Sequence, residues 1–205
     1  MNILVTSGGT IEKIDNVRSI INISTGKLGC LIAEEFLSQK CNVFYMCNKQ
    51  AIKPKANIIY IESVDSLKQA IIDLFKTTEI HIIIHAMAVS DYRLKNPFNG
   101  KLPSDADSIT ITLEKIPKII SMFKELSPNS TLVGFKLLDN VSHNTLIDAG
   151  YNILKQNKCT YVLANDLRDI NDKKHIGHLI DINKNYASYN TKQEIAKAIV
   201  ERSIK

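Results

Sequence analysis

The sequence predicts an α/β protein with a doubly wound, mostly parallel sheet, in the three-layer arrangement of Rossmann-like folds, and with a small C-terminal strand extension. Two observations predict this class. Short apolar runs typical of buried strands alternate with stretches in which apolar residues recur every three or four positions, as on one face of a helix. Strands separated by helices in this way form a parallel sheet between helical layers. The 205 residues favour one domain, residues 1–205, with a sizeable core.

The strand predictions rest on short runs rich in Ile, Val and other apolar residues. They cover, in order, residues 2–6, 42–47, 58–61, 81–86, 109–113, 131–135 and 160–164, followed by a hairpin-like pair at 177–182 and 186–189. This last pair has no obvious place in a doubly wound core.

The helix predictions rest on apolar spacing. Leu28, Ile32 and Phe36 lie at positions i, i+4 and i+8 and predict a helix. Similar spacing predicts helices around 67–75, over 116–126 and over 146–154. The capping box Thr191-x-x-Glu194 opens a final helix.

The first 29 residues predict a phosphate site. The turn Ser7-Gly8-Gly9-Thr10 follows the first strand at its carboxyl end, where open parallel sheets bind ligands. A second glycine-bearing turn, residues 24–29, leads into the first helix, whose N-terminal N–H groups favour an anion. The alternative is that these glycines only make tight turns. Lys27 is followed by Leu28 rather than Ser or Thr, so the run is not a Walker A motif, and no G-x-G-x-x-G is present.

Composition excludes several function classes. Lys and Arg exceed Asp and Glu by 26 to 21, a net charge of +5, but the basic residues are scattered and aromatic residues are few, so nucleic acid binding is not predicted. No apolar run approaches the ~20 residues needed to span a bilayer, so no membrane contact is expected. The four cysteines show no C-x-x-C and follow no signal peptide, which predicts reduced thiols and a cytoplasmic protein. His81 and His85 flank a buried-type strand and are interpreted as core or strand-end residues, and no protein metal ligands are predicted.

Residues 91–107 form the stretch without clear periodicity, and they carry Pro97, Gly100 and Pro103. Loops of this length in a compact domain are commonly lids or binding loops, or else disordered. The position, after the strongest predicted strand, favours a lid. Lys101 would then swing over a bound anion.

Several segments occur in a particular order along the chain: VTSGGTIEKIDNVRSIINISTGKLG, AVSDY, GKLPS, IPKII, VGF and LAND. In this order they resemble phosphopantothenate–cysteine ligase in its standalone bacterial form, without the decarboxylase half of the bifunctional version. The resemblance implies an enzyme of coenzyme A synthesis that joins 4'-phosphopantothenate to L-cysteine through an acyl-nucleotide. It implies CTP rather than ATP as the expected nucleotide, Mg²⁺ carried with it, and a homodimer, with strands in about 167–190 as the expected dimer contact.

The resemblance also implies roles for particular residues. The nucleotide-binding positions are Gly8, Ser24, Gly26, Gly29, Asp91, Lys101, Pro117, Lys118, Ile119, Ile120, Phe135 and Asn165. The substrate-binding positions are Arg18, Asn22 and Ala88. Asn22 and Lys101 are the implied catalytic residues, Lys101 as a charge clamp on the α-phosphate and Asn22 as a contact to the acyl intermediate.

The residues alone allow plainer readings of four positions: a solvated lysine at 101, a core phenylalanine at 135, a turn at Asn165, and a surface charge at Arg18. The chain also departs from the family. It has Lys101-Leu102-Pro103-Ser104 where the fused enzymes have a lysine-rich run, and Lys155 and Lys158 align ambiguously with later family lysines, so neither is assigned to the site.

Three function hypotheses follow. The first is the ligase. The second is a noncatalytic nucleotide-binding subunit, against which the presence of both Asn22 and Lys101 counts. The third is a nicotinamide-dependent oxidoreductase, which lacks its glycine fingerprint.

Overall fold

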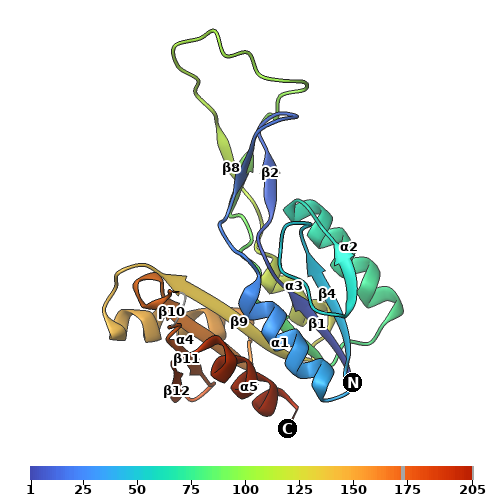
Figure 1. Cartoon of the computed structure of the whole chain (residues 1–205), viewed down its shortest axis with the longest axis vertical. Coiled ribbons are helices and arrows are strands. Elements are labelled where there is room, and N and C mark those ends of the chain that lie inside the picture. The colour runs from blue at the N-terminus through green and yellow to red at the C-terminus, as the bar shows by residue number, and fades with distance from the viewer. Residues whose placement is uncertain (172–173, 205) are drawn as a thin grey trace.

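A parallel sheet forms the centre of the computed structural model, which describes residues 1–171 and 174–204 (Figure 1). Within those residues the sheet has eight strands, in the order β12-β11-β10-β9-β6-β1-β4-β5. From β10 to β5, neighbouring strands are all parallel. These six are β1 (Asn2–Thr6), β4 (Asn42–Cys47), β5 (Asn57–Tyr60), β6 (Ile82–His85), β9 (Thr131–Leu138) and β10 (Tyr161–Asp166). The predicted fold class is confirmed.

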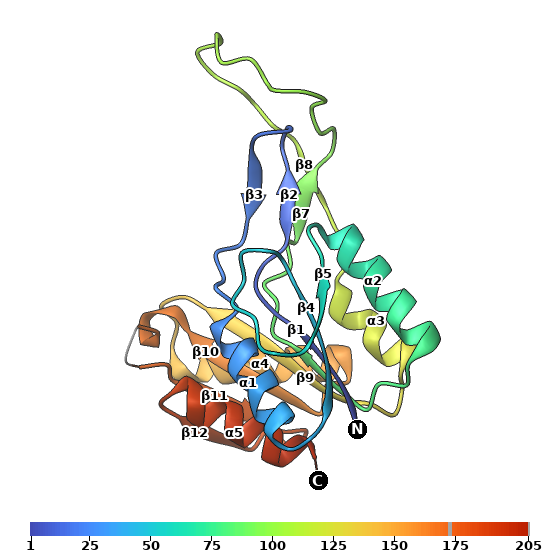
Figure 2. The ribbon, with the colours of Figure 1, turned by 45° about the vertical axis from the view of Figure 1, so that its right-hand side comes forward.

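Helices cover both faces of the sheet (Figure 2). One face carries α1 (Lys27–Ser38) and α5 (Lys192–Ser203), and the other carries α2 (Val64–Thr77), α3 (Ile119–Leu126) and α4 (His143–Asn157). Strand β1 shows why. Ile3 and Val5 belong to the core cluster that includes α1 and α5, while Leu4, between them, belongs to the cluster of α2 and α3. Burial on both faces explains why β1 is apolar throughout rather than alternating.

The C-terminal hairpin extends the main sheet, so the expectation that it has no place there is wrong. Strand β11 (Gly177–Ile180) pairs antiparallel with β10, and β12 (Tyr186–Tyr189) pairs antiparallel with β11. A short 3₁₀ turn, η1 (Leu167–Asp169), precedes the hairpin. Residues 172–173, inside the stretch expected to dimerise, lie outside the described residues. The dimer contact expected over about 167–190 stays a prediction.

An arm projects from the carboxyl edge of the sheet (Figures 1 and 2). It consists of the ribbon β2 (Ile11–Lys13) with β3 (Ser19–Ile21), the ribbon β7 (Tyr92–Leu94) with β8 (Leu113–Lys115), and the loop 95–112. The predicted lid 91–107 therefore begins as a strand. The strand predicted over 109–113 is wrong except at its last residue, because residues 109–112 pair with no neighbouring strand in the described part of the chain. Within that part, their one backbone bond to the other side of the arm is the Lys95 N–H donated to the Thr112 carbonyl.

Two helix starts illustrate local control. Helix α3 begins at Ile119 rather than 116, because the residue before Pro117 is disfavoured in helical geometry and the Ile116 N–H donates instead to the Asp91 carbonyl. The capping box of α5 is confirmed: Thr191 Oγ1 accepts the Glu194 N–H at 3.1 Å. Among the described residues, no helix combines the length and the apolar character needed to cross a membrane.

The structure also shows where the four cysteines, His81 and His85 lie. All four cysteines are free thiols; Cys30, Cys47 and Cys159 are buried. His81 is exposed, whereas His85 is buried at the end of β6 and its Nδ1 lies 2.7 Å from Thr6 Oγ1. Burial lowers the pKa of His85 to about 4. Both histidines are accounted for as strand-end and core residues.

Candidate nucleotide site

The two glycine turns pack against each other at the carboxyl end of β1, and we call residues 7–9 with 24–29 the glycine cradle. Gly8 and Gly26 both have positive φ, at 79° and 74°, which favours glycine. The Ser7 hydroxyl donates to the Gly26 carbonyl at 3.1 Å. A Cβ on Gly29 would lie 2.3 Å from Ser7 Oγ, so only glycine allows this approach. The structure thus brings together Gly8, Gly26 and Gly29, three positions implied to bind the triphosphate.

The start of α1 is a candidate anion-binding position. Gly26 is the N-cap and has no side chain to cap the helix. The Lys27 N–H donates to Thr25 Oγ1 at 3.3 Å. The N–H groups of Leu28 and Gly29 have no partner inside a helix, so they can donate to an outside acceptor. Ser24, half-buried, lies two residues before the cap. The donors gathered here are those of an anion site, which matches the expectation of a phosphate.

Asn48 holds the cradle from β4, and sequence reasoning missed it. Its amide nitrogen donates to the Gly9 carbonyl at 2.6 Å, and its side-chain oxygen accepts the N–H groups of Gln50 and Ala51. These bonds fix Ala51, whose Cβ would be 2.9 Å from a Cβ on Gly8. The available signal was a polar residue directly after a buried strand, at the same edge as the first glycine turn.

Asn22 and Ala88 lie beside the cradle, as the implied substrate positions require. Ala88 forms a parallel bridge with Gly9, and its N–H donates to the Gly8 carbonyl at 2.8 Å. The Asn22 amide donates to the Val89 carbonyl at 3.2 Å. A Cβ on Gly9 would lie 2.5 Å from the Asn22 carbonyl oxygen, so the two backbones touch.

A second group of implied nucleotide contacts lies after β6, at the start of α3 and within β9. Asp91 forms an ion pair with Lys118, the N-cap of α3, and both side chains are exposed. Pro117 is exposed and Ile119 is buried. Ile120 packs on Gly134, because a Cβ added to Gly134 would lie 3.1 Å from Ile120 Cδ1. Phe135, the next residue of β9, is half-buried.

Asn165 lies near the end of β10 and is buried. Its Nδ2 is 3.3 Å from Nε2 of the equally buried His175, whose Nδ1 has no hydrogen-bond partner among the described residues. Burial lowers the pKa of His175 to about 4. Strands β9 and β6 lie between β10, which carries Asn165, and β1, where the cradle lies. His175 was not singled out in the sequence, where nothing links it to Asn165.

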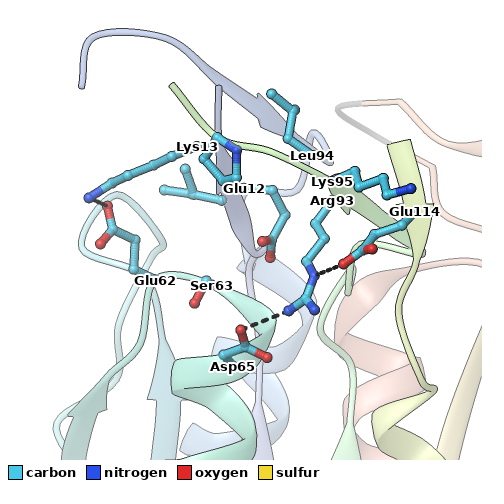
Figure 3. A pocket seen from close by; sticks show the side chains of 11 residues that line it. Glu12, Lys13, Glu62, Ser63, Asp65, Arg93, Leu94, Lys95 and Glu114 are labelled. Atoms are coloured by element: carbon cyan, nitrogen blue, oxygen red, sulfur yellow. Dashed lines mark hydrogen bonds and ion pairs between the residues drawn. The ribbon is translucent and has the colours of Figure 1, made fainter. Parts of the chain in front are cut away.

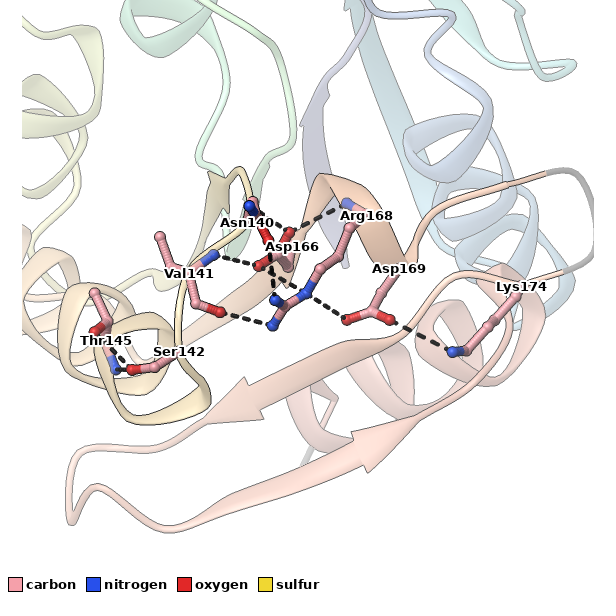
Figure 4. Close-up of polar contacts among 8 residues, drawn as sticks. All are labelled: Asn140, Val141, Ser142, Thr145, Asp166, Arg168, Asp169 and Lys174. Atoms are coloured by element: carbon pink, nitrogen blue, oxygen red, sulfur yellow. Dashed lines mark hydrogen bonds and ion pairs between the residues drawn. The ribbon is translucent and has the colours of Figure 1, made fainter.

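The neighbouring Asp166 explains the turn that follows (Figure 4). Its carboxylate accepts the N–H groups of Asn140, Val141 and Arg168. Burial raises the pKa of Asp166, but these three N–H groups outweigh it and the pKa lies below its ordinary value. Asp166 thereby ties the loop after β9 to the end of β10, which holds Asn165 in place.

Arg18 lies in the turn between β2 and β3, and Lys101 lies in the loop 95–112, so both belong to the arm. The arm projects away from the body that holds the cradle (Figure 1). Arg18 forms an ion pair with Asp15 at 3.0 Å and also donates to the Leu102 carbonyl at 3.2 Å. Lys101 is exposed in the loop 95–112. The structure therefore brings these two implied site residues near each other but not to the glycine cradle.

A cavity of about 350 Å³ lies at the root of the arm (Figure 3). Arg93 of β7 bridges Asp65 at 2.9 Å and Glu114 at 2.8 Å. The buried Glu12 carboxylate accepts the Val64 N–H at the start of α2, and burial raises the pKa of Glu12. No lining residue is an implied site residue, so we interpret these contacts as the anchorage of the arm to the body.

The cradle does not resemble a metal centre. Within residues 1–171 and 174–204, no three His, Cys, Asp or Glu side chains gather as metal ligands would. Its donors are N–H groups and hydroxyls, which suit phosphate oxygens.

Comparison with known proteins gives one family. The model of the DNA/pantothenate metabolism flavoprotein C-terminal domain matches residues 1–205. The chain is 33% identical over 201 residues to the coenzyme A biosynthesis bifunctional protein CoaBC of Thermococcus kodakarensis. The matched region covers 96% of this chain and 49% of that protein. The chain thus spans about half the length of this curated relative.

Solved structures agree. The DNA/pantothenate metabolism flavoprotein from Streptococcus pneumoniae matches with a TM-score of 0.89 and 35% identity, over 98% of this chain and 97% of that one. A Cab2 mutant in complex with phosphopantothenate-cysteine matches with a TM-score of 0.81 over 99% of this chain and 85% of that one. At 18% identity, that second likeness shows the fold alone.

Proposed function

This chain belongs to the DNA/pantothenate metabolism flavoprotein C-terminal domain family, and from that membership we propose that it is a phosphopantothenate–cysteine ligase of coenzyme A biosynthesis. It joins (R)-4'-phosphopantothenate to L-cysteine through an acyl-nucleotide and releases CMP and pyrophosphate. CTP is the proposed nucleotide and ATP the alternative. The name of the archaeal relative, a coenzyme A biosynthesis protein, supports the pathway.

One observation carries the proposal: an anion cradle and a polar amide meet at a single edge of the sheet. The uncapped start of α1 and the Gly8 turn provide N–H groups for a triphosphate. Asn22, whose backbone touches Gly9, places an amide within the same few residues. A nucleotide and an acyl group can therefore be bound side by side.

The chemistry has two steps. A carboxylate oxygen of phosphopantothenate attacks the α-phosphorus of CTP, and the bond to pyrophosphate breaks. The cysteine amine then attacks the acyl carbon of the acyl-cytidylate, loses a proton, and CMP leaves. Both steps redistribute negative charge, so preorganised donors at the cradle stabilise the transition states. Mg²⁺, when bound with the nucleotide, neutralises part of the triphosphate charge.

Asn22 and Lys101 divide this work. Lys101 neutralises charge on the α-phosphate during the first step. Asn22 has an amide that can donate and accept hydrogen bonds, and it orients the acyl group for cysteine in the second step. Arg18 and Ala88 bind the pantothenoyl part, where a planar guanidinium suits an anionic substrate.

The working unit in this proposal is a homodimer. Arg18 and Lys101 lie on an arm that leads away from the cradle of their own chain, so a second copy is the natural recipient of that arm. The arm also exposes apolar side chains: Val17 is 68% exposed and Ile21 is 56% exposed. Exposed apolar clusters of this kind commonly mark protein contacts. This evidence favours the arm over residues 167–190 as the dimer contact.

A turnover assay tests the proposal. Purified protein with Mg²⁺, CTP, 4'-phosphopantothenate and cysteine should form the amide and release pyrophosphate; without cysteine, acyl-cytidylate should form and stall. Parallel reactions with ATP decide the nucleotide. No product with either nucleotide would refute the ligase and favour a noncatalytic nucleotide-binding protein.

A further inference from the structure

Asp15, in the turn between β2 and β3, is a charged residue whose side chain is fully buried. Its Oδ1 accepts the N–H groups of Val17 and Arg18 at 2.7 and 2.6 Å. Its Oδ2 accepts the Arg18 guanidinium and the Leu102 N–H, both at 3.0 Å. A carboxylate that accepts four donors is held in one orientation, and it holds its donors in turn.

The contacts of Asp15 join two segments that are far apart in the chain. Leu102 is 87 positions from Asp15 and belongs to the other half of the arm. Beside this bond, the Asn16 N–H donates to the Gly100 carbonyl at 3.0 Å, and the Arg18 guanidinium donates to the Leu102 carbonyl at 3.2 Å. The turn of the β2–β3 ribbon is thus hydrogen-bonded to the loop at several points.

These bonds bracket Lys101. The residues on both sides of it, Gly100 and Leu102, are bonded to Asn16 and Asp15. The Lys101 side chain is exposed, and no polar partner is recorded for it among the described residues. Its backbone is therefore fixed while its ammonium group remains available to a ligand. Arg18, bound to the same carboxylate, keeps a side chain that is 38% exposed.

We propose that Asp15 is a positioning residue that holds Arg18 and Lys101 at a set spacing. Arg18 then contacts phosphopantothenate, and Lys101 the α-phosphate, as one rigid unit. The inference rests on the proposed function. It holds whichever copy of the chain receives the arm, because all the bonds lie within one arm. Hydrogen bonds, that from Leu102 first, lower the pKa of Asp15, which keeps the carboxylate charged at neutral pH.

The central variant is Asp15→Asn, which keeps the shape but presents an N–H₂ group to one set of donors. Asp107→Asn, an exposed acid in the same loop, is the matched control. In single-turnover reactions without cysteine, Asp15→Asn should slow acyl-nucleotide formation about 10²-fold, the effect of misplacing a group by about an ångström. It should also raise the KM for phosphopantothenate, while the control changes neither.

A double variant of Asp15 and Lys101 separates a positioning role of Asp15 from a general loss of folding. If Asp15 acts through Lys101, Asp15→Asn should slow activation by less than about threefold in a Lys101→Ala background, because residues in one network are not additive. Leu102→Pro removes the N–H that Asp15 binds but leaves the Asp15–Arg18 pair. It should slow activation without raising the KM for phosphopantothenate.

The opposite results overturn the inference. Full additivity with Lys101→Ala, or an Asp15→Asn enzyme that activates phosphopantothenate at the wild-type rate, means that Asp15 does not position the clamp. If the wild-type protein makes no product at all, the proposed function fails instead. Amide hydrogen exchange then still reports on the link: Asp15→Asn should speed exchange at both residues 15–18 and 98–102, and unchanged exchange in the loop refutes the link.

Discussion

Replacing Gly29 by Ala tests the glycine cradle most directly. The added Cβ would lie 2.3 Å from Ser7 Oγ and 2.7 Å from Ser7 Cβ, distances that force Ser7 or α1 to move. Ser7 is fully buried, and its hydroxyl donates to the Gly26 carbonyl, so its movement also loses that bond. The cradle and the start of α1 should therefore shift together.

The magnitude follows from three effects. Overpacking a filled site costs about 1–3 kcal/mol. Loss of the Ser7 hydrogen bond costs roughly 1 kcal/mol more. The better helix propensity of Ala offsets up to about 1 kcal/mol of this. The free energy of unfolding should fall by about 2 kcal/mol, which lowers the midpoint of thermal unfolding by about 4–8 °C in a chain of this size.

Chemical denaturation and nucleotide titration measure the two consequences separately. Gly150→Ala is the matched control, because a Cβ on this glycine of α4 would lie 2.6 Å from Ile180 Cδ1, in a different core cluster. Both variants should be destabilised, but Gly29→Ala alone should bind CTP at least about tenfold more weakly. Equal nucleotide affinity in the two variants, or an unchanged stability of Gly29→Ala, would refute the assignment of the cradle.

Three further predictions concern catalysis, assembly and pH. Asn22→Asp replaces the amide that donates to the Val89 carbonyl, and this variant should still form acyl-nucleotide but accumulate it. Lys101→Ala should instead slow formation of the acyl-nucleotide by about 10²–10³-fold. Quenched single-turnover reactions with labelled phosphopantothenate identify the species that builds up, and accumulation only in the Lys101 variant would reverse the two roles. Ile21→Asp, on the arm, should shift the protein in sedimentation toward a species of 23.0 kDa, whereas Ile182→Asp, on the C-terminal hairpin, should not. The reverse pattern would favour the hairpin as the dimer contact. Burial lowers the pKa values of His85 and His175 to about 4, so the unfolded chain binds more protons between pH 6.5 and 4. The free energy of unfolding should therefore fall as the pH is lowered through that window. His85→Gln should flatten the fall in denaturant titrations, and an equally steep fall would contradict a buried neutral His85.

Local patterns in the sequence were sufficient for the centre of the sheet. The predicted bounds of β1 and β4 match the structure, because strands buried on both faces require a continuous apolar run. The capping box at Thr191 acts over three residues and was equally readable. The positive φ of Gly8 and Gly26 likewise reflects a turn whose residues are adjacent in sequence.

Local patterns failed on the arm. Residues 109–113, Ile-Thr-Ile-Thr-Leu, alternate as a strand does, yet the strand begins only at Leu113 because residues 109–112 have no neighbouring strand. Strands β2 and β3 are three residues long each, and they carry too few apolar residues to be recognised as strands from the sequence. It forms because the two strands pair with each other, and the buried Glu12 at its root caps α2.

The sequence by itself determined the α/β class, the two glycine turns and the residue types available to bind a nucleotide and an acyl group, because those depend on patterns a few residues long. The tertiary structure alone decided which of those residues meet. It packs Ser7 against Gly29, brings Asn48 to Gly9, and buries Asp15 against Leu102, 87 positions away. Such contacts depend on strand order and on the pairing of distant segments, and no local period or spacing encodes which segments the folded chain places side by side.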